Sequence, residues 1–241
     1  MDISPELQAR FDAAAARQND YQPSESVRRI IKNKTLVMIV APAAMGKSFV
    51  ISHALAADPR FAQTVSFTTR DPRAGDEGNM RTIPRDEQHI GTLMEMIEAG
   101  QVVNYAIFPT TGMLYGTDLM SYSGEINLMP ALANSVRGLR QIGFGRTLTI
   151  GLVTAPQTWR HWFDMRFPEP TAEKTARLKE ALLSIAWSLE DSDIQWLINR
   201  EDDANSTTQD LISLVNGKLI DTTQALGYAQ ELRTMISQML Q

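Results

Sequence analysis

The fold of this chain is decided by the stretch Thr35-Leu36-Val37-Met38-Ile39-Val40-Ala41-Pro42-Ala43-Ala44-Met45-Gly46-Lys47-Ser48. Its first six residues form a continuous apolar run, which is typical of a parallel strand buried on both faces. Residues 41–48 then fit the spacing small-x-x-x-x-Gly-Lys-Ser, and a helix is expected after them through Ala57. A strand, a loop of this pattern and a helix in this order indicate a phosphate-binding loop.

The residue types in the loop suit a nucleoside triphosphate. Backbone N–H groups and the N-terminus of the following helix point at phosphate oxygens in such loops. Lys47 is expected to bridge the β- and γ-phosphates as a catalytic residue, and Ser48 to bind Mg²⁺. The expected cofactors are therefore ATP and Mg²⁺, and the expected ATP-binding residues of the loop are Ala43, Ala44, Met45, Gly46, Lys47 and Ser48.

Strand and helix patterns alternate along the rest of the chain. Apolar runs predict strands at residues 64–68, 102–108, 148–153 and 194–198, and helical patterns cover residues 91–99, 126–140, 171–189 and the C-terminal region. This alternation predicts an α/β fold with a mainly parallel sheet and helices on both faces. Residues 1–22 are alanine-rich and predict a helix, which we interpret as a surface appendage or an oligomer contact.

Composition excludes several kinds of protein. With 241 residues, 43% of them hydrophobic, the chain can bury the core of one α/β domain with an inserted lid, or of two small domains. The net charge of −5 argues against a nucleic acid partner. The sequence has no cysteine, which excludes a thiolate metal site and fits a cytoplasmic protein. No apolar run reaches membrane-spanning length, and His53, His89 and His161 lack metal-binding spacing.

A second motif follows the loop, at Ser66-Phe67-Thr68-Thr69-Arg70-Asp71-Pro72-Arg73-Ala74-Gly75-Asp76. It resembles the monophosphate-binding signature of guanylate kinases, Ser-x-Thr-Thr-Arg-x-Pro-Arg-x-Gly-Glu. Seven positions match in order and Asp76 replaces the glutamate. The run Tyr115-Gly116-Thr117 and the asparagine Asn199 after the last expected strand are further similarities.

The resemblance covers about residues 34–215 and implies a P-loop kinase fold for them. Within this domain it implies an acceptor-binding insertion at about 66–125 and a lid at about 156–175. Residues 1–33 are then a helical extension, and residues 216–241 a C-terminal helix.

The same resemblance implies roles for single residues. Arg70 and Arg73 carry planar guanidinium groups that hold a phosphate through two parallel hydrogen bonds. By resemblance, Asn199 contacts the adenine of ATP. The implied catalytic residues are Lys47, Arg70, Arg166 and Arg177, and the implied acceptor-binding residues are Ser66, Arg70, Arg73, Asp76, Arg81, Asn104, Tyr115 and Thr117.

Two departures from the family pattern affect substrate and turnover. Asn104 stands where guanylate kinases carry a glutamate that accepts two hydrogen bonds from guanine, and an amide offers only one acceptor oxygen. It would suit a base that presents both a donor and an acceptor. Met129 and Ala131 stand near the positions of family aspartates that orient magnesium waters and catalytic arginines.

Three functions fit this pattern. The first is a nucleoside monophosphate kinase that transfers the ATP γ-phosphate to GMP, dGMP or a related, modified nucleotide. The second is a guanylate-kinase-like module that binds nucleotides without turnover, which the missing acidic residues suggest. The third is a kinase of a hydroxyl on a modified DNA base, which the altered base pocket suggests. The expected partners are small nucleotides; a homo-oligomer remains open.

Overall fold

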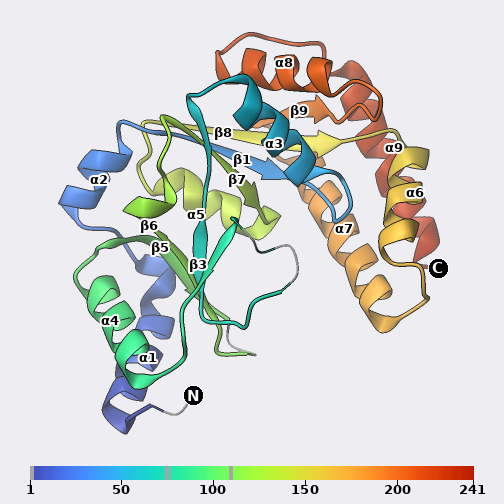
Figure 1. Cartoon of the computed structure of the whole chain (residues 1–241). Helices are drawn as coiled ribbons and strands as arrows, with labels where there is room; N and C mark the ends of the chain where they lie inside the picture. Colours follow the sequence, from blue (N-terminus) through green and yellow to red (C-terminus); the bar gives the residue numbers. More distant parts are fainter. Residues whose placement is uncertain (1–2, 74–75, 77, 109–110) are drawn as a thin grey trace. The chain divides into compact units, whose positions relative to one another are not determined.

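The computed structural model describes residues 3–73, 76, 78–108 and 111–241 (Figure 1). The chain divides into two compact units that alternate along the sequence. Unit 1 comprises Met1–Thr35, Ala62–Asn127 and Gly138–Arg146. Unit 2 comprises Leu36–Phe61, Leu128–Arg137 and Thr147–Gln241.

A five-stranded sheet that is mostly parallel carries most of unit 2. Its strand order is β2 (Phe61–Gln63), β7 (Ile126–Ala131), β1 (Thr35–Val40), β8 (Arg146–Val153) and β9 (Ile194–Ile198). Strands β8 and β9 pair in parallel, and the arrows of β1, β8 and β9 point the same way in Figure 1. Residues 36–40 of β1 are almost completely buried, as expected for a strand covered on both faces.

Helices cover both faces of this sheet. Figure 1 shows α3 (Lys47–Ala57) and α8 (Ala204–Val215) on one side of it and α7 (Ala172–Glu190) on the other. Helix α9 (Thr223–Met239) packs on α6 (Pro156–Arg166) and α7. The predicted α/β fold with a mainly parallel sheet and helices on both faces is confirmed.

The helix predicted over residues 126–140 is wrong in its first half. Residues Ile126–Ala131 form strand β7, between β2 and β1, and only Val136–Gln141 form a helix, α5, after the 3₁₀ turn η3 (Ala133–Ser135). Short apolar runs buried on both faces do not separate strand from helix by periodicity. Pro130 was the available signal, because the residue before a proline avoids the helical region.

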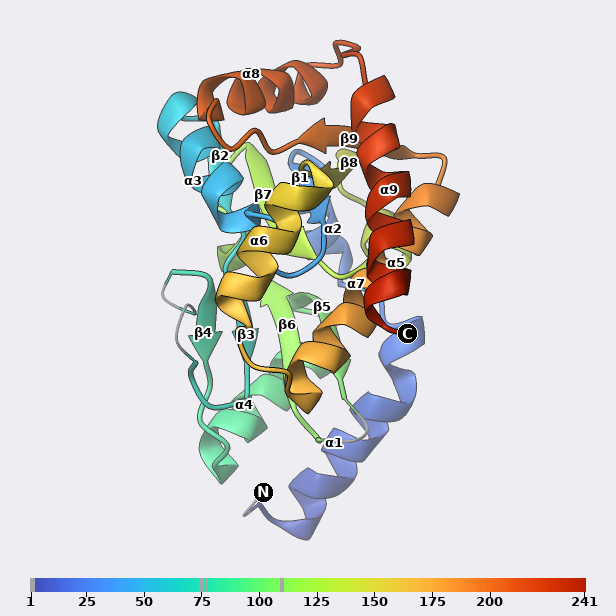
Figure 2. The same cartoon turned by 90° about the vertical axis from the view of Figure 1, so that its right-hand side faces the viewer.

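Unit 1 is built on a four-stranded sheet of its own. The strand order is β4 (Met80–Thr82), β3 (Ser66–Thr68), β6 (Leu114–Asp118) and β5 (Val102–Ile107). Strand β6 runs antiparallel to both β3 and β5, whereas β4 is parallel to β3. Helices α1 (Pro5–Arg17) and α4 (Glu87–Glu98) lie side by side on one face of this sheet (Figure 2). The remaining elements are η1 (Gln18–Asp20), α2 (Glu25–Ile31) and η2 (Leu119–Ser121).

Helix α1 belongs to the core of unit 1, so its interpretation as a surface appendage is wrong. Leu7, Phe11 and Ala14 form an apolar stripe on one face of the helix and are buried in the core cluster with residues of α4 and β5. The Tyr105 hydroxyl donates to the Ala14 carbonyl at 2.9 Å. Arg10 also holds the Glu98 carboxylate through two hydrogen bonds, of 2.9 and 2.7 Å.

Across the described ranges, no helix combines the length and the apolar character that crossing a membrane requires.

Candidate functional site

The loop between β1 and α3 has the backbone shape of a phosphate-binding loop. Gly46 has a φ of +82° and ends the loop directly before the first residue of α3. A Cβ atom at this position would overlap the Asn199 amide nitrogen, so both conformation and space require glycine. Ala44 also has a positive φ, +61°, which is uncommon for a residue with a side chain. The loop is therefore held in a curved shape at some conformational cost.

Lys47 lies folded back onto its own loop. Its ammonium group donates to the carbonyl oxygens of Ala41, at 2.6 Å, and Pro42, at 3.0 Å. Burial of this group lowers the pKa of Lys47 to about 8; Glu180 opposes this effect, and Arg166 adds to it. A ligand with phosphate oxygens would replace the weak carbonyl acceptors by charged ones.

A pocket of about 470 Å³ opens on the loop. Asn199 lines it at the end of β9, where its Nδ2 donates to the Met45 carbonyl at 3.0 Å. The Asn199 Oδ1 is buried and has no hydrogen-bond donor among the described residues. The predicted residues Ala43, Ala44, Met45, Gly46, Lys47, Ser48, Arg166 and Asn199 all line this pocket.

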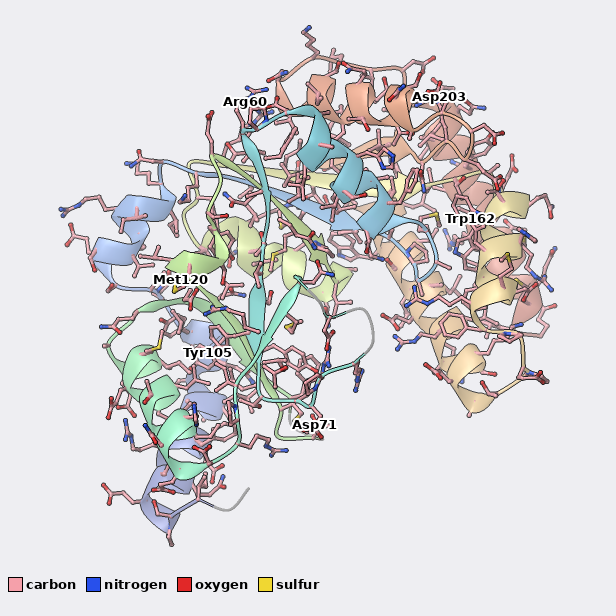
Figure 3. The ribbon with its side chains drawn as sticks, viewed as in Figure 1. Arg60, Asp71, Tyr105, Met120, Trp162 and Asp203 are labelled. Carbon is pink, nitrogen blue, oxygen red and sulfur yellow. The ribbon has the colours of Figure 1, made fainter. Side chains whose placement is uncertain are left out.

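Three lining residues were not predicted from the sequence: Phe49, Trp162 and Glu201. Trp162 lies on α6 (Figure 3), one turn after Trp159, whose Nε1 donates to the Ala43 carbonyl at 3.0 Å. The aromatic spacing within residues 159–163 was the available signal, since residues three and four apart share a helix face. Helix α6 thus buttresses the loop.

Arg177, predicted to be catalytic, does not line this pocket. It lies on α7 and pairs with Glu180 at 2.9 Å and, more weakly, with Glu173 at 3.9 Å. Its catalytic role stays a prediction.

The four-stranded sheet of unit 1 has an apolar and a polar face. Phe67, Tyr105 and Leu114 face the core under α1 and α4. The register pairs Thr68 with Tyr115 and Asn104 with Thr117, so these residues share the opposite face with Ser66. One face of this sheet thus carries five residues that the sequence analysis quoted: Ser66, Thr68, Asn104, Tyr115 and Thr117.

A β-bulge turns Asn104 onto the polar face. Val102 pairs with Asp118, but Asn104 pairs with Thr117, so one extra residue stands in β5. Val102 and Val103 are consequently both buried. With regular alternation, Asn104 would point to the same face as Val102, into the apolar core.

Arg70, directly after β3, is held by Asp76. Its Nη1 and Nη2 each donate to one oxygen of the Asp76 carboxylate at 2.7 Å, and Nη1 also donates to the Asp71 carbonyl at 2.8 Å. The Asp76 carboxylate additionally accepts from the Arg73 backbone N–H at 2.7 Å. These bonds raise the pKa of Arg70, with a smaller contribution from Tyr115, and lower the pKa of Asp76. The guanidinium is positioned but not exhausted as a donor, since it has five N–H groups.

Arg81 lies apart from the polar face. It pairs with Phe67 in the register of β3 and β4 and forms an ion pair of 2.6 Å with Asp118. Both positions belong to the face that carries the apolar core. Its acceptor-binding role stays a prediction, and Ala74 and Gly75 of the motif lie outside the described residues.

Sequence comparisons find guanylate kinases among known proteins. No family model matches the chain. A guanylate kinase of Prochlorococcus marinus (strain MIT 9312) is 29% identical over 161 residues, 65% of this chain and 83% of that protein. A guanylate kinase of Rhodococcus jostii (strain RHA1) is 27% identical over 203 residues, 83% of this chain and 95% of that protein.

Other matches are shorter or weaker. A guanylate kinase of Xanthomonas euvesicatoria pv. vesicatoria (strain 85-10) is 37% identical over 75 residues, which are only 30% of this chain and 34% of that protein. The crystal structure of a guanylate kinase from Anaplasma phagocytophilum aligns with a TM-score of 0.45 at 14% identity, covering 78% of this chain and 87% of that one. On the sequence similarities that extend over most of both chains, this protein is similar to guanylate kinases.

Proposed function

We propose that this protein is an ATP-dependent nucleoside monophosphate kinase. The observation that supports this most directly is the loop of residues 41–48, whose backbone shape, lysine and serine suit a triphosphate. The similarity to guanylate kinases supports a nucleotide as the acceptor.

The residues around the loop fit ATP. Gly46 ends the curved loop at the N-terminus of α3, which favours negative charge. Lys47 would exchange its two carbonyl partners for the β- and γ-phosphates, and Arg166 would add a second cation beside them. The unpaired Asn199 Oδ1 offers an acceptor to an amino group, which adenine carries.

Mg²⁺ would be held by the Ser48 hydroxyl and by phosphate oxygens. Among the described residues, no three acidic or histidine side chains gather into a metal-binding group. Water and phosphate would therefore supply most of the remaining ligands, which is usual for this ion. When bound, Mg²⁺ neutralises charge on the transferred phosphoryl group.

The acceptor monophosphate is assigned to unit 1. Arg70, positioned by Asp76, has N–H groups left for a phosphate, and Arg73 lies exposed three residues further on. Tyr115 on the polar face would contact the phosphate, and Thr117 would act on the base through its hydrogen bond to Asn104. Phosphoryl transfer needs positioning and charge neutralisation more than covalent help from the protein, and these residues would supply both.

The test is a kinase assay with ATP, Mg²⁺ and each ribo- and deoxyribonucleoside monophosphate. We expect one acceptor class to stimulate ADP formation well above the level of Lys47→Ala. If no acceptor does so although ATP binds, the protein is a nucleotide-binding module without turnover.

Arg70→Ala separates the two substrates. Since Arg70 is assigned to the acceptor, its loss should weaken acceptor use by about 100-fold or more, as for a charged hydrogen-bonding partner, and leave ATP affinity within about twofold. The matched control is Arg10→Ala, because Arg10 also holds a carboxylate through two hydrogen bonds but lies on α1. Equal losses of ATP and acceptor binding in Arg70→Ala would contradict the assignment.

A further inference from the structure

Three side chains on and beside the polar face of unit 1 form a hydrogen-bonded chain. The Thr117 hydroxyl donates to Asn104 Oδ1 and lies 2.9 Å from the Tyr122 hydroxyl. Thr117 and Tyr122 are each about 1% exposed, whereas Asn104 is only half-buried. This series of hydrogen bonds therefore leads from the buried Tyr122 phenol to the Asn104 amide, which is partly exposed.

The buried end fixes the direction of every bond. Thr117 is the hydrogen-bond partner of the Tyr122 hydroxyl in the described part of the chain. If Asn104 were turned so that Nδ2 donated to Thr117, the hydroxyl groups of Thr117 and Tyr122 could donate only to each other. Only one of the two can donate in that contact, so one hydroxyl hydrogen would have no acceptor. Burying such a hydrogen is costly. The satisfied arrangement has Tyr122 donating to Thr117 and Thr117 donating to Asn104.

Burial also keeps the phenol in its donating form. It raises the pKa of Tyr122 above its ordinary value, an effect that the Thr117 hydrogen bond only partly offsets. Tyr122 therefore stays protonated throughout the physiological range. The amide of Asn104 then presents Nδ2 outward, and no described residue accepts a hydrogen bond from that nitrogen.

We infer that Asn104 selects the base by donating Nδ2–H to a ring nitrogen or carbonyl oxygen, with Thr117 and Tyr122 locking its orientation. This inference rests on the proposed function, which places the acceptor nucleotide at unit 1. The substrate class is a nucleoside monophosphate whose base presents a hydrogen-bond acceptor at this position. The 2-amino group of guanine, a pure donor, would face another donor there, because the amide oxygen is turned inward toward the buried Thr117.

Binding without turnover tests the consequence that the 2-amino group of guanine gains nothing at Asn104. IMP and GMP carry the same base edge except for the 2-amino group, so their affinity ratio measures recognition of that group alone. We expect the protein to bind IMP at least as tightly as GMP in calorimetric titrations without ATP. Asn104→Asp replaces the outward donor by an acceptor of the same size, and should shift the ratio toward GMP by about tenfold.

The lock is tested by Thr117→Val combined with Tyr122→Phe. This pair removes both hydroxyls together and keeps their shapes, so no buried donor is orphaned. The amide of Asn104 can then turn, and the ratio should move toward GMP by about threefold to tenfold. Tyr105→Phe is the control: it removes another buried phenol hydrogen bond, to Ala14, on the opposite face, and should leave the ratio unchanged.

The outcomes separate the two proposals. Base selectivity that responds to these variants, without phosphoryl transfer, would support the recognition and overturn the kinase. Transfer with a preference for GMP over IMP, unmoved by Asn104→Asp, would overturn the recognition and keep the kinase. Failure of every monophosphate to bind would overturn both.

Discussion

Binding of ATP should take up a proton at Lys47. In the free protein the ammonium group donates to the carbonyls of Ala41 and Pro42, and its burial lowers the pKa of Lys47 to about 8. Phosphate oxygens favour the charged form, so the pKa must rise in the complex. The protein therefore binds ATP more weakly as pH rises through 8, because a growing fraction of lysine must first be protonated.

The size of the effect follows from this pKa. At pH 8 half of the lysine is neutral, so binding takes up about 0.5 proton, against about 0.1 at pH 7 and about 0.9 at pH 9. Affinity at pH 9 should be about tenfold lower than at pH 7, or about 1.4 kcal/mol. Phosphate itself titrates near pH 6, so a window above pH 7.5 isolates the lysine.

Isothermal titration calorimetry in buffers of different ionisation enthalpy measures the uptake. Lys47→Arg is the matched control, because arginine stays charged over this range and should bind ATP without proton uptake. Uptake near zero at pH 8.5 in the unaltered protein, or equal uptake in Lys47→Arg, would show that the lysine is already fully charged in the free loop and refute the reasoning.

Further changes probe the loop, the core and the acceptor residues. Gly46→Ala should abolish measurable ATP binding, since φ is +82° and the new Cβ meets Asn199, whereas Ala44→Gly should retain it and change stability by less than about 1 kcal/mol. Phe11→Ala should cost about 3–5 kcal/mol in chemical denaturation; a loss under about 1 kcal/mol would mean that α1 is not part of the core. Asp76→Asn should weaken monophosphate binding about tenfold by loosening Arg70 while ATP titrations stay unchanged; unaltered monophosphate affinity would show that Arg70 needs no such support.

The sequence was most informative where function depends on neighbours in the chain. The loop of residues 41–48 requires consecutive residues of particular size and charge, so its position and the flanking strand and helix could be predicted. The arginine motif could be predicted for the same reason, because Arg70 and Asp76 form their hydrogen bonds at a sequence separation of six residues. Such contacts arise from local geometry, which spacing records.

Other features depend on what packs against a segment. The strand β7 and the burial of α1 follow from the partners that cover them, and an apolar run does not reveal those partners. Trp162 and Glu201 line the loop pocket only because α6 and the segment after β9 fold back onto the loop.

The sequence by itself determined the phosphate-binding loop, the arginine motif and the α/β class, because each depends on contiguous residues or on the periodicity of apolar residues. Only the tertiary structure decided which way Asn104 faces and what it can donate. A single bulge in β5 turns its side chain over, and a buried phenol five residues beyond Thr117 sets the direction of its hydrogen bond. Both effects depend on pairing across strands and on burial, which no spacing along the chain encodes.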